Sequence, residues 1–319
     1  MKLIITIDTE EDGWDSYRPT GNTVRNIERV PALQSLFDEF DVKPTYLVTH
    51  PVATDDKAVS ILNAIRDRGG CEIGSHCHPW NTPPFDEEIN KKNTMLCNLP
   101  KELQFKKLSV LDEAIRRSFG IKPTSFRCGR WGYSRDVAEN LQRLGYRVDT
   151  SIAAYMDWRA YDGPDFSTTS PGAFRFKADD ILSESRDGAM AEVPATVGFL
   201  QRRYALSNRI LKTVSRRPIN RLRLTGILCR LNIVNKVWLS PEFSDAATMI
   251  RLAGTMIKNN YAFINMSFHS PDLCPGMTPF VRTKEEEMEF FKRIRGFLTF
   301  ARGEGMEPIK LSDSIKFLQ

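Results

Sequence analysis

The chain contains no run of about 18 apolar residues, which is the length that a membrane-spanning helix requires. It begins with a strand-like segment, residues 1–8, and not with the basic, apolar and cleavage-site regions of a signal peptide. The cysteines form no compact disulfide framework, so we expect free thiols. They are Cys71, Cys77, Cys97, Cys128, Cys229 and Cys274. These absences predict a cytoplasmic protein, peripheral at most to the inner membrane face.

Acidic residues are missing from one long segment. Between Arg202 and Lys236 there are ten Lys/Arg and no Asp/Glu. The rest of the chain therefore has 45 − 10 = 35 basic residues against 40 acidic ones, although the whole chain has a net charge of +5. The positive charge is confined to this segment, and we expect no nucleic-acid partner.

What remains is an ordinary globular composition, with 41% hydrophobic and 27% charged residues. Apolar runs alternate with helical patterns, which predicts an α/β fold with a parallel sheet. The predicted strands are 2–8, 44–50, 72–78, 125–130, 146–152, 191–196 and 261–269. The predicted helices are 31–40, 57–68, 101–119, 135–144, 240–260 and 284–302. A barrel needs about 250 residues, so we predict one domain over 1–319, with a basic insertion at about 197–239.

Polar residues gather at the carboxyl ends of these strands. They are Asp8, Glu10, His50, His76, His78, Arg127, Asp149, Glu192 and His269. In (β/α) barrels that rim hosts the active site, whereas an open sheet places its site mainly at one crevice. Because several strands contribute, a barrel is favoured.

Two short motifs offer metal ligands. Side chains two residues apart on a strand share a face, so His76 and His78 can present two imidazoles together, as a metal site needs. The same spacing pairs Asp8 with Glu10, and one carboxylate could bind a metal while the other acts as a base. Unrelated rim histidines and a solvated acidic turn are the alternative interpretations.

Arg127 can pair with Asp8 and keep it ionised, or it can simply close the barrel with a salt bridge. His269 is a candidate general acid, because imidazole titrates near neutral pH; a structural histidine is the alternative. His50 has no obvious partner.

Taken together these residues resemble the polysaccharide deacetylase family, also called carbohydrate esterase family 4 or the NodB-homology domain. The resemblance rests on residues 6–12 (TIDTEED), 72–80 (EIGSHCHPW), 126–132 (FRCGRWG), 149–158 and 268–270 (FHS). It is strongest to the divergent cytoplasmic WalW-like branch, which is linked to lipopolysaccharide and exopolysaccharide biosynthesis.

The resemblance implies a single distorted (β/α)7 TIM-like barrel with loop insertions, a divalent metal, usually Zn²⁺, and hydrolysis of N-acetyl groups on amino sugars. Asp8 matches the family's base, Arg127 the arginine that orients it, and His269 the acid. The metal carboxylate is displaced by one position, to Glu10. The second metal histidine, His78, lies at i+2 from His76 instead of i+4.

The expected substrate is an N-acetylated sugar or a lipid-linked glycan. Trp80, Trp131 and Trp158 could wall a sugar site, with Arg130 beside them, although core or cap packing explains each tryptophan equally well. Two other functions stay open: a hydrolase of non-sugar amides or imides on the same barrel, and a non-catalytic sugar-binding barrel.

The basic segment, Arg202–Lys236, interleaves its cations with apolar residues at partly helical spacing. Basic amphipathic stretches of this kind lie on anionic membrane surfaces. We therefore predict a peripheral membrane contact there; an ordinary solvated surface is the alternative.

Overall fold

The computed structural model describes residues 1–216 and 224–318. The strands are β1 (Lys2–Thr9), β2 (Thr45–Val48), β3 (Glu72–Cys77), β4 (Ser125–Cys128), β5 (Val148–Asp149), β6 (Phe174–Phe176), β7 (Met190–Glu192), β8 (Val197–Phe199), β9 (Lys236–Trp238), β10 (Phe263–His269) and β11 (Glu307–Pro308). The helices are α1 (Val30–Asp38), α2 (His50–Ala53), α3 (Asp56–Asp67), α4 (Lys101–Phe119), α5 (Arg135–Arg143), α6 (Tyr204–Val214), α7 (Leu224–Arg230), α8 (Ala246–Lys258) and α9 (Lys284–Gly303).

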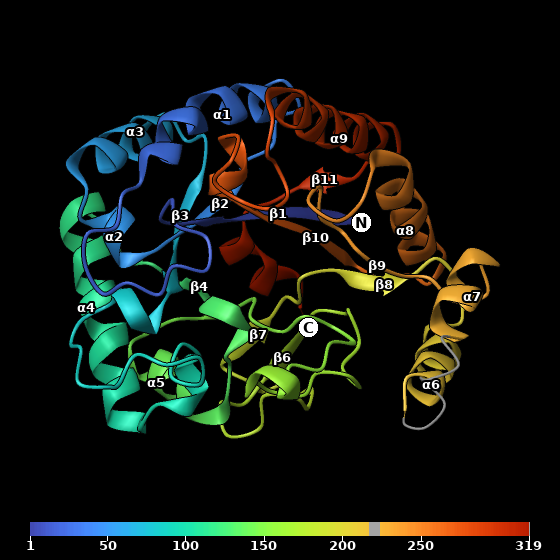
Figure 1. The fold of residues 1–319 in the computed structure, drawn as a ribbon, viewed down its shortest axis with the longest axis horizontal. Coiled ribbons are helices and arrows are strands. Elements are labelled where there is room, and N and C mark those ends of the chain that lie inside the picture. Colours follow the sequence, from blue (N-terminus) through green and yellow to red (C-terminus); the bar gives the residue numbers. More distant parts are fainter. Residues whose placement is uncertain (217–223, 319) are drawn as a thin grey trace.

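A curled sheet forms the centre of the fold, with strand order β10-β1-β2-β3-β4-β5-β7-β6. Every neighbouring pair from β10 to β7 is parallel, β6 is antiparallel to β7, and β11 lies parallel to the start of β1. Helices α1, α3, α4, α8 and α9 run around the outside of the sheet (Figure 1). The predicted α/β fold with seven parallel strands is confirmed, as a curled half-barrel of the distorted (β/α)7 type.

The gap between β7 and β10 contains single main-chain hydrogen bonds. Thr196 N donates to Asn265 O at 3.1 Å, Leu239 N donates to Thr196 O at 2.9 Å, and Ser267 N donates to Leu239 O at 3.2 Å. These bonds link the two sides of the curl without a continuous ladder. The carboxyl ends of the strands consequently face one another across a common space.

Two apolar layers explain why the strands are buried on both faces. The outer layer packs the sheet against the helices, and it includes Ile5 and Ile7 of β1. The inner cluster fills the inside of the curl. It contains Ile4, Leu47, Val148, Ala191, Val193, Phe263, Leu311 and Ile315. Parallel strands covered on both faces read as nearly continuous apolar runs, which is why β1 was recognisable.

Local interactions explain where the elements begin and end, both where these boundaries agree with the predictions and where they differ. Helix α4 ends as expected at Gly120, whose φ is 62°. Helix α8 begins after Asp245, whose carboxylate caps Thr248 N at 2.7 Å, and not at residue 240. Strand β5 stops at Asp149 because the Asp149 carboxylate accepts a hydrogen bond from Ser151 N at 2.8 Å.

The predicted basic insertion leaves the barrel as a hairpin, in which β8 pairs antiparallel with β9. Helices α6 and α7 extend from this hairpin, outside the ring formed by the other helices (Figure 1). Arg217, Arg221 and Arg223 lie outside the described residues. Among the helices of the described ranges, none has the length and apolarity required to cross a membrane.

Candidate metal centre and active-site pocket

Strand β3 directs two imidazoles toward one point. His76 lies in the strand, and His78 follows it with extended backbone, φ −98° and ψ 110°. Their Nε2 atoms are 2.9 Å apart, and both side chains are buried. Cys77, between them, points into the apolar core, as the alternation of a strand requires.

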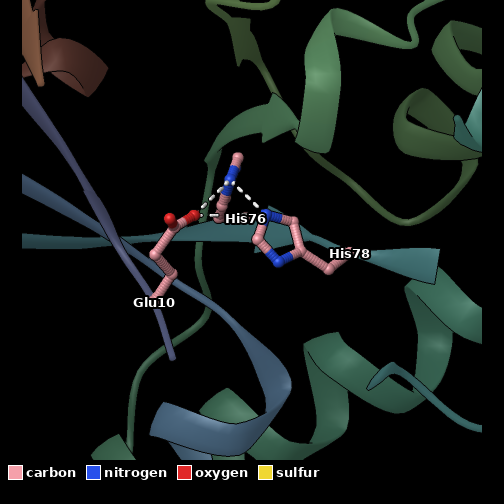
Figure 2. Close-up of side chains that lie close together, drawn as sticks. All are labelled: Glu10, His76 and His78. Atoms are coloured by element: carbon pink, nitrogen blue, oxygen red, sulfur yellow. Dashed lines mark hydrogen bonds and ion pairs between the residues drawn. The ribbon is translucent and has the colours of Figure 1, made fainter. Parts of the chain in front are cut away.

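The end of β1 supplies a carboxylate to the same point. Glu10 Oε2 lies 3.2 Å from His78 Nε2 and 3.5 Å from His76 Nε2. Figure 2 shows the three side chains converging from the two strands. Ligands about 2.0–2.1 Å from a zinc ion stand about 3.3 Å from one another in a tetrahedron. Two nitrogen donors and one oxygen donor at these separations fit a divalent metal.

The other ring nitrogens have partners that fix the orientation of both histidines. His76 Nδ1 lies 3.0 Å from the Arg127 carbonyl oxygen, to which it donates. His78 Nδ1 donates to Glu11 Oε1 at 2.9 Å. Because Nδ1 donates in both residues, Nε2 is the nitrogen that each imidazole could offer to a metal beside Glu10. Carboxylate and carbonyl partners of this kind are typical of metal-binding histidines.

Asp8 lies beside this cluster and is held by Arg127. Arg127 Nη1 donates to Asp8 Oδ1 at 2.6 Å, and Nη2 donates to Thr6 Oγ1 at 2.7 Å. Burial alone would raise the pKa of Asp8, but the Arg127 guanidinium and the imidazoles of His76 and His269 outweigh it and lower that pKa. Asp8 is therefore an ionised carboxylate with one oxygen directed to the pocket.

His269, at the end of β10, faces Asp8 from the opposite side. Its Nε2 is 3.6 Å from Asp8 Oδ2, and its Nδ1 donates to Glu242 Oε1 at 2.7 Å. Burial disfavours a charged imidazole, but Glu242, Glu10 and Asp8 together raise the pKa of His269 well above its ordinary value. His269 thus carries a proton near neutral pH. Asp272, next to Glu242, has a raised pKa because burial and the Glu242 charge disfavour its ionised form.

These groups line a cavity of about 510 Å³. All four residues predicted to contact substrate, Trp80, Arg130, Trp131 and Trp158, lie in its wall. Trp80 stacks on His78 with a centroid distance of 4.1 Å, and the rings of Trp131 and Trp158 are parallel to within 6°. His50 is not among the lining residues and begins α2 instead.

The turn after β4 brings the backbone close to the metal ligands. Arg130 and Trp131 have φ values of 53° and 61°, which few residues other than glycine adopt. A Cβ atom added to Gly129 would lie 2.4 Å from His78 Cδ2. Only glycine leaves room for the imidazole here, and the strained turn directs Trp131 into the cavity.

Sequence reasoning missed several residues of this site. The charge of Glu11 was visible beside Glu10, but its contact with His78 was not. Glu242 lies 27 positions before His269, and no spacing rule joins them. Six further aromatic side chains of the wall lie outside the motifs quoted above. They are Trp14, Tyr17, Tyr161, Trp238, Phe243 and Phe280.

Comparison with known families agrees with this geometry. Residues 10–148 match the family model for polysaccharide deacetylase. This match covers 139 of the 319 residues of the chain. The matched range contains Glu10, His76, His78 and Arg127, while Asp8 and His269 lie outside it. No curated protein sequence matches the chain.

Solved structures support the fold. A Parabacteroides distasonis protein assigned as a glycoside hydrolase/deacetylase is 10% identical with a TM-score of 0.60, covering 98% of this chain and 70% of its own. The 4-alpha-glucanotransferase of Thermococcus litoralis is 12% identical with a TM-score of 0.55, covering 99% and 40%. A Mycobacterium smegmatis protein assigned to the polysaccharide deacetylases is 14% identical with a TM-score of 0.47, covering 96% and 92%. At such identities the first two likenesses establish a shared fold only.

Proposed function

We propose that this chain belongs to the polysaccharide deacetylase family and is a metal-dependent hydrolase that removes N-acetyl groups from an amino sugar or a polysaccharide precursor. The observation that carries the proposal is the convergence of Glu10, His76 and His78 in one wall of an aromatic-lined cavity, flanked by Asp8 and His269. Zn²⁺ is the metal we propose, because zinc combines imidazole and carboxylate ligands in sites of this size.

Glu10, His76 and His78 would hold the metal. When bound, it would polarise the acetyl carbonyl and lower the pKa of a water molecule. Asp8, ionised beside Arg127, accepts the proton from the attacking water. His269, protonated and aligned by Glu242, donates a proton to the departing amine. Asp8 Oδ2 and His269 Nε2 lie 3.6 Å apart beside the proposed metal ligands, so an ionised base and a protonated acid face the same part of the cavity.

The cavity wall favours a sugar over a small free amide. Trp131 and Trp158 offer flat apolar faces for the C–H side of a pyranose ring. Arg130, half-buried in the same wall, offers a cation at the cavity edge. An N-acetylated sugar, free or lipid-linked, is therefore the proposed substrate. We also propose a cytoplasmic location, for which the free thiols of all six cysteines are the support.

Acetate release from N-acetylated monosaccharides, oligosaccharides and lipid-linked sugars, with and without added zinc, tests the proposal. We expect zinc-dependent release that chelation abolishes. Asp8→Asn should abolish turnover and retain zinc, because Asp8 is placed as a base, whereas His78→Ala should lose both. His269→Ala should slow turnover by about 10²–10⁴-fold, the usual contribution of a general acid.

Two results would point to the alternative functions. Absence of stoichiometric zinc in the purified protein, together with sugar binding, would indicate a non-catalytic sugar-binding barrel. Zinc-dependent hydrolysis of cyclic imides or simple amides, with no acetate released from any amino sugar, would indicate a non-sugar amidase on the same site.

A further inference from the structure

The helices of the basic segment expose an unusual combination of side chains. We define the basic helical face as Leu206, Arg209, Arg216, Ile227, Arg230 and Leu231. Leu206, Ile227 and Leu231 are 45%, 52% and 63% exposed, although each is a large apolar side chain. The three arginines are exposed as well.

Helical spacing places these residues on common faces. Leu206, Arg209 and Arg216 follow one another at i, i+3 and i+10 from α6 into the turn after it, which corresponds to one side of a helix. Ile227, Arg230 and Leu231 occupy i, i+3 and i+4 at α7. The opposite side of α6 holds the buried Tyr204 and Ser207, which pack inward. The exposed side of these helices therefore carries both cations and apolar groups.

The cations of this face lack acidic partners in the part of the chain that the structure describes. In residues 1–216 and 224–318, no carboxylate lies within 4.0 Å of the guanidinium groups of Arg209, Arg216 or Arg230. Elsewhere on the surface, exposed arginines such as Arg135, Arg282 and Arg295 form ion pairs. The sequence from 202 to 236 contains no Asp or Glu, so no acidic side chain of the segment itself can neutralise these cations.

Other basic residues of the segment have internal roles and connect it to the active-site wall. Lys212 Nζ donates to Ser167 Oγ at 3.0 Å, and Asn208 Nδ2 donates to Ser167 O at 2.8 Å. Lys236 Nζ donates to Tyr155 O at 3.1 Å. The loop between Tyr155 and Ser167 carries Trp158, which lines the cavity. A partner bound at α6 and α7 would thus lie one packed layer from the substrate site.

We infer that the basic helical face docks on an anionic lipid surface. Arginine stems and half-exposed Leu and Ile side chains enter the headgroup region, while the guanidinium groups pair with lipid phosphates. A purely electrostatic partner such as a nucleic acid would leave Leu206, Ile227 and Leu231 in water. An apolar protein groove would leave the three arginines unpaired. Only a surface that is both anionic and apolar satisfies both sets of side chains.

The test is co-sedimentation of the full chain with vesicles of phosphatidylcholine alone or mixed with phosphatidylglycerol, at low and high salt. This binding assay needs no turnover, so its result stands whether or not the proposed deacetylase activity is found. We expect sedimentation with the phosphatidylglycerol vesicles at low salt, little with phosphatidylcholine alone, and release at high salt, since exposed charges are screened.

Two variants separate the contribution of the arginines to vesicle binding from that of the apolar side chains. Arg209, Arg216 and Arg230 changed together to Gln should weaken binding about 100-fold, since each basic residue near an anionic membrane contributes about fivefold. Leu206, Ile227 and Leu231 changed together to Ser should also weaken binding, with no change in charge. The matched control changes the exposed Lys43, Arg147 and Arg186 to Gln, which removes the same charge elsewhere.

Circular dichroism and thermal unfolding would show that each variant folds. Equal recovery in the supernatant with both vesicle types at low salt overturns the inference. So does an equal loss in the control variant, which would indicate net charge alone. Binding that is insensitive to the leucine and isoleucine changes, but is competed by a soluble polyanion such as heparin, would assign the face to a polyanionic partner instead.

Discussion

Glu11 offers the sharpest test of the proposed metal centre, because it touches a proposed ligand without being one. Its Oε1 accepts hydrogen bonds from His78 Nδ1 at 2.9 Å and from Trp80 Nε1 at 3.3 Å, and its side chain is 5% exposed. Burial limits solvent screening of the charge. The Glu11 carboxylate therefore fixes the His78 tautomer and makes its Nε2 a better donor to a metal.

Removal of such a carboxylate lowers metal affinity by about 10–100-fold. That range corresponds to about 1.4–2.7 kcal/mol of binding free energy. Glu11→Gln keeps an oxygen that can accept from His78 Nδ1 but removes the charge, so we expect the lower part of this range. Glu11→Ala also removes the acceptor and frees the imidazole to rotate, so we expect the upper part or more.

Competition titration of the metal-free protein with zinc, against a chromophoric chelator, measures the affinity. Glu287→Gln is the matched control, because Glu287 is equally buried but pairs with Arg29 and Lys284, none of which lines the cavity. Unchanged zinc affinity in both Glu11 variants, with intact folding, would refute the assignment of His78 as a metal ligand oriented by Glu11.

Three further predictions concern the frame around the site. Gly129→Ala should reduce zinc affinity more than it reduces thermal stability, because the new Cβ would lie 2.4 Å from His78 Cδ2; isothermal titration and a thermal melt compare the two. Glu192→Gln should stabilise the protein increasingly as pH rises. Burial and the Asp149 carboxylate raise the pKa of Glu192 well above its ordinary value, and burial raises that of Asp149 to about 6. A carboxyl group whose pKa is raised in the folded state loses its stabilising contribution as pH rises from its unfolded-state pKa to its folded-state pKa. In urea unfolding, the stability of the Glu192→Gln variant relative to the unmodified protein should therefore grow by about 1.4 kcal/mol per pH unit above about pH 5. A stability difference that does not change with pH would contradict this prediction. Lys107→Met should cost about 3–5 kcal/mol in urea unfolding, because it leaves the carboxylate of Glu87, which lies 2.8 Å from the fully buried Lys107 Nζ, without its cation and removes the donor to three carbonyl oxygens of residues 79–84; a loss below 1 kcal/mol would count against that role.

The order and type of the main elements followed from the sequence. Apolar runs in β1, β3 and β10 are long enough to be recognised as buried strands, and Gly120 marked the end of α4 correctly. The shortest strands could not be recognised in this way. β8 and β9 each have three residues and pair with each other in a separate two-stranded sheet. A three-residue strand has too few positions for a hydrophobic period to stand out.

The same division applies to the site. Two-residue spacing brought His76 and His78, and Asp8 and Glu10, onto shared faces, because strand alternation is a property of neighbouring residues. Arg127 and His269 were found by resemblance and by their place at strand ends. Their partners were not visible: Glu242 reaches His269 across 27 positions, and Tyr17 and Trp238 enter the cavity wall from segments without a motif.

The sequence by itself thus determined which residues share a strand face and in what order the strands follow. Only the tertiary structure decided how far the sheet curls, which loops cover its open rim and which charges lie beside the two histidines. The physical reason is the distance along the sequence over which the relevant interactions act. Backbone alternation and helix ends depend on interactions within a few residues, whereas the position of Glu242 against His269 depends on the packing of the whole chain around one apolar interior.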